Sequence, residues 1–106
     1  MKKIINLTPH TLNFVFNETK IDIEPSGSIA RVSAKDTPMN PINGIPVFKT
    51  EYGEIENLPA PEVDTIYVVS SLVAARCPER ADVFFPGRPV RDNQGRIVGC
   101  AALSHV

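Results

Sequence analysis

Two adjacent serines, Ser70 and Ser71, follow a continuous apolar run and precede a short segment of helical character. The first turn of a helix presents backbone N–H groups without partners, together with the positive end of the helix dipole. Serine hydroxyls at that position add further donors for a bound anion. The pair is therefore a candidate corner for a phosphate or carboxylate, although serine is also a common simple helix cap.

The cations of the last part of the chain are all arginines, without a lysine: Arg76, Arg80, Arg88, Arg91 and Arg96. Arginine is the residue that binds planar anions through two parallel hydrogen bonds. We expect Arg80, Arg88 and Arg91 to converge on the helix N-terminus, with Tyr67 as a stacking face for a planar ligand. In the alternative, these guanidinium groups pair with the acids nearby in the sequence, which are Glu79, Asp82 and Asp92.

Metal, cofactor and hydrolytic chemistry find less support in the sequence. The two histidines, His10 and His105, lie near opposite ends of the chain, and Cys77 and Cys100 have no CxxC companion. No metal or cofactor is predicted, and both cysteines are expected to be buried, reduced thiols. A small hydrolase with a serine nucleophile and a histidine base is a third hypothesis, but neither a GxSxG turn nor an orienting acid is present.

The segments before residue 60 predict an antiparallel meander. Residues 3–7 form a first short strand, and period-two alternation indicates a hairpin of residues 12–16 and 20–24. The meander consists of this hairpin and a further strand expected over 28–33, which is followed by a loop over 34–41. Asn43-Gly44 is a favoured type I′ turn. It leads into an edge strand over 45–49, limited by Pro46, and then into a loop over 51–64 with at most one short strand.

The segments after residue 60 predict a strand, a helix and a strand. The apolar run 66–69 is typical of a central strand covered on both faces. A short helix over 72–76 ends before Pro78, and a strand resumes at 83–85, so a parallel pair is possible. A final hairpin turns at 92–95, and its second strand, 96–103, contains Gly99 and other small residues that allow close approach of a neighbouring backbone.

Size and composition set the class of protein. The 106 residues, 42% hydrophobic and 22% charged, predict one domain over 1–106. Its fold class is α+β, with a mainly antiparallel small sheet or partly open barrel and one short helix. The net charge of −1 argues against nucleic-acid or membrane-surface binding through bulk charge. No secretory signal or membrane-spanning run is visible, so a cytoplasmic location is expected.

Several sequence segments resemble those of small uncharacterised proteins encoded by phages and bacteria. The segments are Ile5-Asn6-Leu7-Thr8-Pro9-His10, Thr65-Ile66-Tyr67-Val68-Val69-Ser70 with Val73-Ala74, Arg80 with Asp82, and Val90-Arg91-Asp92 with Gly95-Arg96-Ile97-Val98-Gly99. The resemblance spans nearly the whole chain and implies a cytoplasmic accessory protein of phage or prophage type. It assigns no role to any residue.

Two functional hypotheses lead from this sequence. The first is a non-enzymatic protein that binds a small anionic, nucleotide-like ligand at Ser70 and Ser71. The second is a protein-interaction or self-assembling structural module, in which the edge near Pro46 and the small-residue strand 99–102 pack against another chain. The two are compatible, because small domains often build ligand pockets between the subunits of a homo-oligomer.

Overall fold

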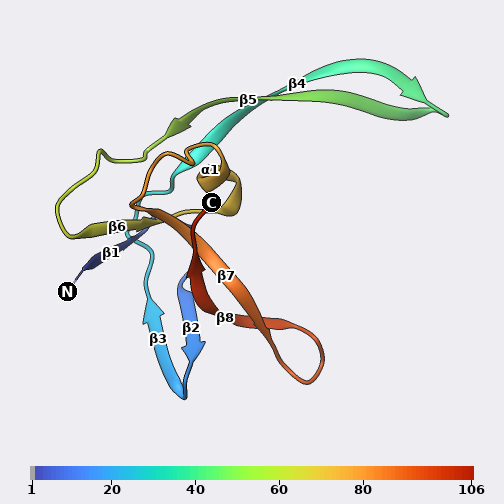
Figure 1. Ribbon diagram of the computed structural model, residues 1–106. Coiled ribbons are helices and arrows are strands. Elements are labelled where there is room, and N and C mark those ends of the chain that lie inside the picture. Colours follow the sequence, from blue (N-terminus) through green and yellow to red (C-terminus); the bar gives the residue numbers. More distant parts are fainter. Residues whose placement is uncertain (1) are drawn as a thin grey trace.

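A computed structural model describes residues 2–106 of the protein (Figure 1). Over these residues the chain forms eight strands and one helix. The elements are β1 (Lys3–Asn6), β2 (Leu12–Phe16), β3 (Thr19–Ile23), β4 (Arg31–Ile42), β5 (Ile45–Glu56), β6 (Thr65–Val68), α1 (Ser71–Ala75), β7 (Val83–Arg91) and β8 (Ile97–Ser104).

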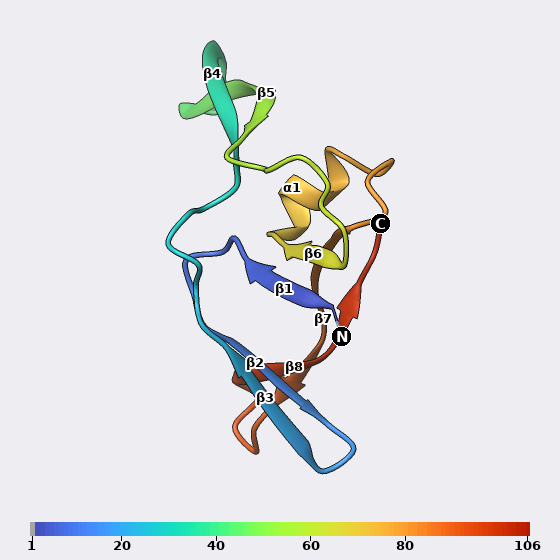
Figure 2. The same cartoon turned by 90° about the vertical axis from the view of Figure 1, so that its left-hand side faces the viewer.

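Six of the strands form one sheet in the order β1-β6-β7-β8-β2-β3, and β4 pairs only with β5. The larger sheet curls into a half-barrel, with β1 and β3 as its two edges (Figure 2). A mostly-sheet fold with one short helix is confirmed. The prediction of a mainly antiparallel sheet is wrong, because β1–β6, β6–β7 and β2–β8 are parallel pairs and only β7–β8 and β2–β3 are antiparallel.

The core lies around β6, which has a parallel neighbour on each side. Tyr67, Val68 and Val69 have no exposed surface, as expected for a strand covered on both faces. Alternation divides the core in two. Tyr67 and Val69 join the cluster that includes Val73 and Val83, whereas Val68 packs on the other side with a cluster containing Phe14.

Helix α1 connects β6 to β7, so the predicted strand-helix-strand unit with a parallel pair is confirmed. Ser70 has extended backbone angles, and its hydroxyl accepts a hydrogen bond from the N–H of Val73, which makes it the N-cap. Val73 and Ala74 are the buried residues of this five-residue helix. Their side of α1 anchors the crossover to the core.

The largest corrections concern residues 28–56. The expected third strand of the meander does not pair with β3, since β4 starts at Arg31 and pairs with β5 alone. The predicted loop over 34–41 is wrong, because the segment is strand throughout. In 51–64, where one short strand was allowed, the residues as far as Glu56 continue β5 and the rest is loop. Pro38 and Pro41 suggested a loop, but a two-stranded ribbon has two free outer edges, where a missing N–H breaks no hydrogen bond.

The β4–β5 ribbon extends away from the half-barrel as an arm (Figure 1). The turn at its tip is Asn43-Gly44, whose φ angles of 51° and 78° confirm the type I′ prediction. The molecule measures 52 × 40 × 23 Å, with a radius of gyration of 16.8 Å. A compact chain of this length would have a radius of gyration of about 13 Å, so the extended shape is a property of the arm.

Asn6, buried at the end of β1, connects the two edges of the half-barrel. Its side-chain amide donates to the carbonyl oxygen of Ile23 on β3 (3.1 Å) and to that of His10 (2.7 Å). Its side-chain oxygen accepts from the N–H and the hydroxyl of Thr8. All four hydrogen-bonding positions of this amide are thus occupied inside the protein.

Replacing Asn6 by Asp is expected to lower the free energy of unfolding by about 3–5 kcal/mol. The carboxylate would face two carbonyl oxygens that now accept hydrogen bonds, with little exposure to water. Thermal and urea unfolding measure the loss. The matched control is Asn93→Asp in the exposed β7–β8 turn, for which we expect less than about 0.5 kcal/mol. Equal stability of the two variants would contradict this role for Asn6.

Candidate functional site

The two serines of the predicted anion corner are exposed at the start of α1. The hydroxyl of Ser70 already caps the helix by accepting from the N–H of Val73 at 3.4 Å. The carbonyl of Ser70 accepts the N–H of Ala74 at 3.0 Å. With only five residues, α1 has a small dipole. The geometry of this corner is that of a capped helix.

Arg80 lies at the far end of the β6–β7 pair from Ser70. The two strands are parallel, with Val83 beside Tyr67. Arg80 comes just before β7 and so lies near the start of β6, whereas Ser70 comes just after the end of β6. Its guanidinium donates to both carboxylate oxygens of Asp82 (2.8 and 2.9 Å) and to the carbonyl of Pro59 (3.0 Å).

The Arg80–Asp82 pair is mostly buried, with side-chain exposures of 20% and 18%. Hydrogen bonding to Arg80 lowers the pKa of Asp82 below its ordinary value, and hydrogen bonding to Asp82 raises the pKa of Arg80. The carbonyl oxygen of Arg80 also lies 2.9 Å from Nε2 of His105. Arg80 therefore ties the start of β7 to the loop after β5 and to the C-terminal segment.

Arg88 and Arg91 lie farther along β7, beyond the end of β6. Arg88, between Gly87 and Pro89, is exposed and has a φ of 51°. Arg91 donates to the carbonyl of Gly95 across the end of the β7–β8 hairpin (2.7 Å). The structure thus separates Arg80 from Arg88 and Arg91.

The alternative raised for the arginines was pairing with acids nearby in the sequence. The structure shows such pairs for Arg80 with Asp82 and for Arg96 with Asp92, where Nε and Oδ2 are 3.4 Å apart. Tyr67 offers no stacking face, since it has no exposed surface and its hydroxyl donates to the carbonyl of Ala60 (3.1 Å). Burial raises the pKa of this tyrosine. Over residues 2–106, the structure does not bring Ser70, Ser71 and the candidate arginines together around one space.

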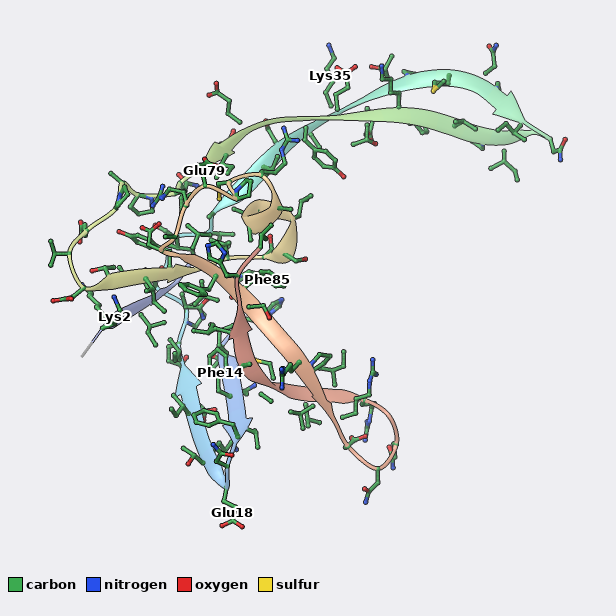
Figure 3. The ribbon with its side chains drawn as sticks, viewed as in Figure 1. Lys2, Phe14, Glu18, Lys35, Glu79 and Phe85 are labelled. Carbon is green, nitrogen blue, oxygen red and sulfur yellow. The ribbon has the colours of Figure 1, made fainter. Side chains whose placement is uncertain are left out.

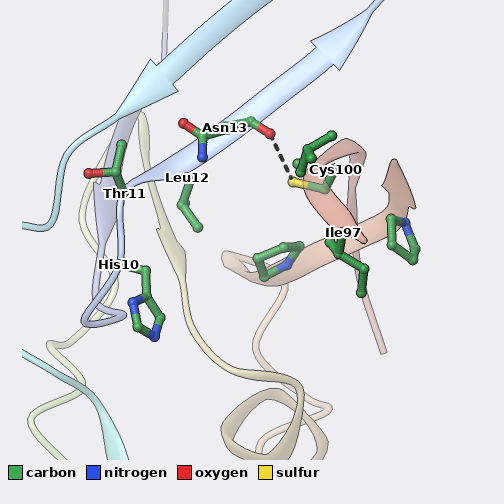
Figure 4. A pocket seen from close by; sticks show the side chains of 10 residues that line it. His10, Thr11, Leu12, Asn13, Ile97 and Cys100 are labelled. Atoms are coloured by element: carbon green, nitrogen blue, oxygen red, sulfur yellow. Dashed lines mark hydrogen bonds between the residues drawn. The ribbon is translucent and has the colours of Figure 1, made fainter. Parts of the chain in front are cut away.

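A cavity of about 500 Å³ lies between the start of β2 and the β7–β8 hairpin (Figure 4). Its walls contain no Asp, Glu, Lys or Arg, and its ionisable side chains are those of His10 and Cys100. The thiol of Cys100 is directed at the carbonyl oxygen of Asn13 (3.7 Å), and burial raises its pKa. A protonated, hydrogen-bonded thiol is a weak nucleophile, so the cavity does not have the chemistry of a cysteine hydrolase.

The remaining candidate catalytic groups are also in structural roles. The Cys77 thiol donates to the carbonyl of Val73 (3.4 Å), and burial raises its pKa as well. The ring of His105 packs edge-on against Phe84. Within residues 2–106 no three potential metal ligands cluster. In this part of the chain the cysteines are free and buried, as the sequence predicted.

A second, smaller recess of about 290 Å³ opens on the inner face of the half-barrel and is almost wholly apolar. Its walls come from β1, β2, β3 and β8: Ile4, Phe14, Phe16, Ile21, Ile23, Ala101, Ala102 and Leu103. We call it the β1–β3 recess. Ile21 is 43% and Phe16 37% exposed at its rim. The alternation of β2 and β3 indicated an apolar face, but not that this face would remain uncovered.

The tip of the arm is a second uncovered apolar surface. Residues 37–48 contain no charged side chain, although 22% of the chain is charged. Met39 pairs with Val47 and Ile42 with Ile45, and because Val47 and Ile45 are two residues apart, both pairs lie on one face. Phe48 lies on the opposite face. The exposed fractions are 55% for Met39, 62% for Ile42, 63% for Ile45 and 55% for Phe48.

The Arg80–Asp82 pair predicts an acid-sensitive contribution to stability. Because the folded-state pKa of Asp82 is lowered, the contribution is present above its ordinary value of 3.8 and is lost as the pH falls below that value. Asp82→Asn should lower the free energy of unfolding by about 1–3 kcal/mol at pH 7 and by progressively less toward pH 2. Urea unfolding across this range measures it. The free energy of unfolding of the exposed control, Asp22→Asn, should follow that of the unmodified protein at every pH. A loss of stability in Asp82→Asn that stayed constant down to pH 2 would contradict an ionic contribution from the Arg80–Asp82 pair.

Inorganic phosphate is expected to leave the melting temperature unchanged, because no set of arginines converges on Ser70. A site with a Kd of about 0.1 mM would contribute about 2.7 kcal/mol at about 10 mM phosphate. Differential scanning fluorimetry against sodium chloride of equal ionic strength provides the comparison. A rise that Arg88→Ala abolishes and Lys35→Ala preserves would show that the arginines do form an anion site.

Among residues 2–106, no helix has the length and apolar character needed to cross a membrane. Comparison of the chain with models of protein families, with curated proteins and with solved structures gave no match.

Proposed function

We propose that the protein is a protein-interaction and self-assembling structural module whose working part is the β4–β5 arm. The observation that carries this proposal is the arm itself, with twelve residues in each strand and exposed apolar side chains on both faces of its uncharged tip. Figure 3 shows side chains projecting from both sides of the arm into open space.

Energetics favour a partner for this arm. An isolated two-stranded ribbon is marginally stable in water, since neither face buries enough apolar surface. Covering a large apolar side chain contributes about 1.5–3 kcal/mol. Four such side chains are more than half exposed at the tip: Met39, Ile42, Ile45 and Phe48. Contact with another protein surface would therefore supply the stabilisation that the free arm lacks.

The base of the arm is fixed to the half-barrel, whereas the tip is free. Val32 and Ile55 pack against the core cluster around Tyr67. Nη2 of Arg76 lies 3.5 Å from the carbonyl oxygen of Tyr52, and the side-chain amide of Asn57 donates to the carbonyl of Ile29 (3.2 Å). A fixed base and an unsupported apolar tip are the properties of an element that presents a contact surface.

The prolines of the arm support contact through its faces. Pro38, Pro41 and Pro46 lie in the outer half, where each removes a backbone donor. Exposed strand edges otherwise pair with other chains without control, and proline is one residue that prevents this. The arm can then bind through side chains on its faces while its edges resist aggregation.

The other hypotheses have less support. An anion-binding protein needs a converging set of donors, and the candidate arginines are apart or locally paired. A serine hydrolase needs a histidine beside its nucleophile, but the Ser70 hydroxyl caps α1 and His105 contacts Phe84 and the Arg80 carbonyl, at the far end of the β6–β7 pair. A structural role also agrees with an accessory protein of the kind implied by the resemblance to small phage and bacterial proteins.

Hydrogen exchange of the dilute protein tests whether the arm needs a partner. At low micromolar concentration we expect amides of residues 37–48 to exchange with protection factors below about 10, and those of residues 66–69 to be protected by the global stability. Mass spectrometry of overlapping peptides or NMR measures both. The β2–β3 hairpin, whose sheet is anchored to the core, is the internal comparison.

Arm amides as strongly protected as those of β6 in the dilute protein would overturn the proposal, because the arm would then be stable on its own. A shortened variant gives a second measurement. Replacing residues 37–49 by Asn-Gly leaves the Asp36–Thr50 pair beside a two-residue turn. This variant should keep the melting temperature of the full chain within a few degrees, since the core lies outside the removed residues.

A further inference from the structure

We propose, building on the proposed function, that the partner of the arm is a second copy of this chain and that its tip inserts into the β1–β3 recess. The face of the tip that carries Met39, Ile42, Ile45 and Val47 would enter the recess. Each copy then donates an arm to one neighbour and accepts an arm from another.

The recess is the place where the half-barrel lacks a strand. β1 and β3 are the edges of the sheet, and each has a strand neighbour on one side only. They meet where the Asn6 amide donates to the carbonyl of Ile23, and they diverge from there toward their first residues (Figures 1 and 2). Ile4 on one edge and Ile21 and Ile23 on the other line the opening.

The two surfaces match in chemistry and in size. All eight residues around the recess are uncharged and apolar, and residues 37–48 of the tip have no charge either. The recess has a volume of about 290 Å³. An apolar cavity of about 150 Å³ accommodates one benzene, so the recess has room for roughly two aliphatic side chains. Ile42 and Ile45, a cross-strand pair next to the turn, supply such a pair.

A copy cannot fill its own recess. The tip of the arm and the β2–β3 hairpin lie at opposite ends of the molecule in both ribbon views (Figures 1 and 2). The contact must therefore form between copies, with different surfaces on its two sides. Such head-to-tail contacts close into a ring or extend as a filament.

The size of the arm is suited to a stable contact. Specific interfaces bury about 800 Å² and about 20–30 residues on each side. The recess alone is too small for that, but the arm has twelve residues in each strand, nearly all exposed. The tip in the recess would form the apolar centre, and the charged part of the arm, with Lys35 and Glu51, would lie along the polar rim.

Cross-linking between two variants, each with one added cysteine, tests the contact. Ile45→Cys on the tip is mixed with Ile21→Cys at the rim of the recess, and disulfides form under mild oxidation. Mass spectrometry of the linked peptides distinguishes this bond from any that involves Cys77 or Cys100. We expect the mixed dimer to form at least tenfold faster than with the control Gln94→Cys, which places an exposed cysteine in the β7–β8 turn.

Sedimentation velocity over a concentration series provides the second measurement. The unmodified chain should assemble with increasing concentration, and both the shortened arm and Ile21→Lys should remain monomeric. The matched control is Asp22→Lys, the next residue on the same strand, which points to the other face and should assemble like the unmodified chain. Circular dichroism confirms that each variant is folded.

The outcomes separate this inference from the proposed function. A chain that stays monomeric at millimolar concentration overturns the second copy as partner. In another outcome, the shortened arm abolishes assembly, but Ile21→Lys assembles like Asp22→Lys and the Ile45→Cys/Ile21→Cys pair cross-links no faster than its control. That result would overturn the recess as the acceptor of the arm. In either case, rapid exchange of the arm amides in dilute solution would leave the arm as an interaction element, whereas slow exchange there would overturn the proposed function itself.

Discussion

One buried side chain, the amide of Asn6, joins the two edge strands of the curled sheet. Edge strands of an open sheet are ordinarily separate, yet here the amide hydrogen-bonds the end of β1 to the end of β3. The same side chain binds Thr8 and the carbonyl of His10, and the Asn6 carbonyl accepts the N–H of Ser26. The segment from Ile5 to His10 thus has a structural role: it closes one end of the half-barrel.

Local features of the fold were predictable because their causes lie within a few residues. The apolar run 66–69 predicts a covered strand, Ser70 a helix cap, and Asn43-Gly44 a type I′ turn, and all three are found. The order of the strands was not predictable, because β2 and β8 are distant in sequence and Phe14 meets Cys100 only in the folded chain. Their close approach requires Gly99, where a Cβ atom would lie 2.7 Å from the Asn13 carbonyl oxygen. The small residues of 96–103 predicted that a backbone would approach closely, but not that this backbone would be β2.

The candidate site shows the same limit. Residue types alone made Arg80 an anion ligand or a partner of Asp82, and strand direction decides between them. Because β6 and β7 are parallel, Arg80 and Ser70 lie at opposite ends of the pair. Arg80 instead donates to Asp82, two residues along the chain, and this pair does not depend on contacts between distant segments. The arm was missed for a different reason: its prolines break strands within a sheet, but are tolerated on the free edges of a ribbon.

Two features of this chain are each incomplete alone, and each provides what the other lacks. The half-barrel has an apolar inner face between β1 and β3 that no strand within residues 2–106 covers. The arm has apolar side chains on both faces and no sheet to cover them. Both strands of the arm extend away from the half-barrel and are fixed to it at the base by Val32 and Ile55. In the proposed assembly, copies joined head to tail would cover both surfaces.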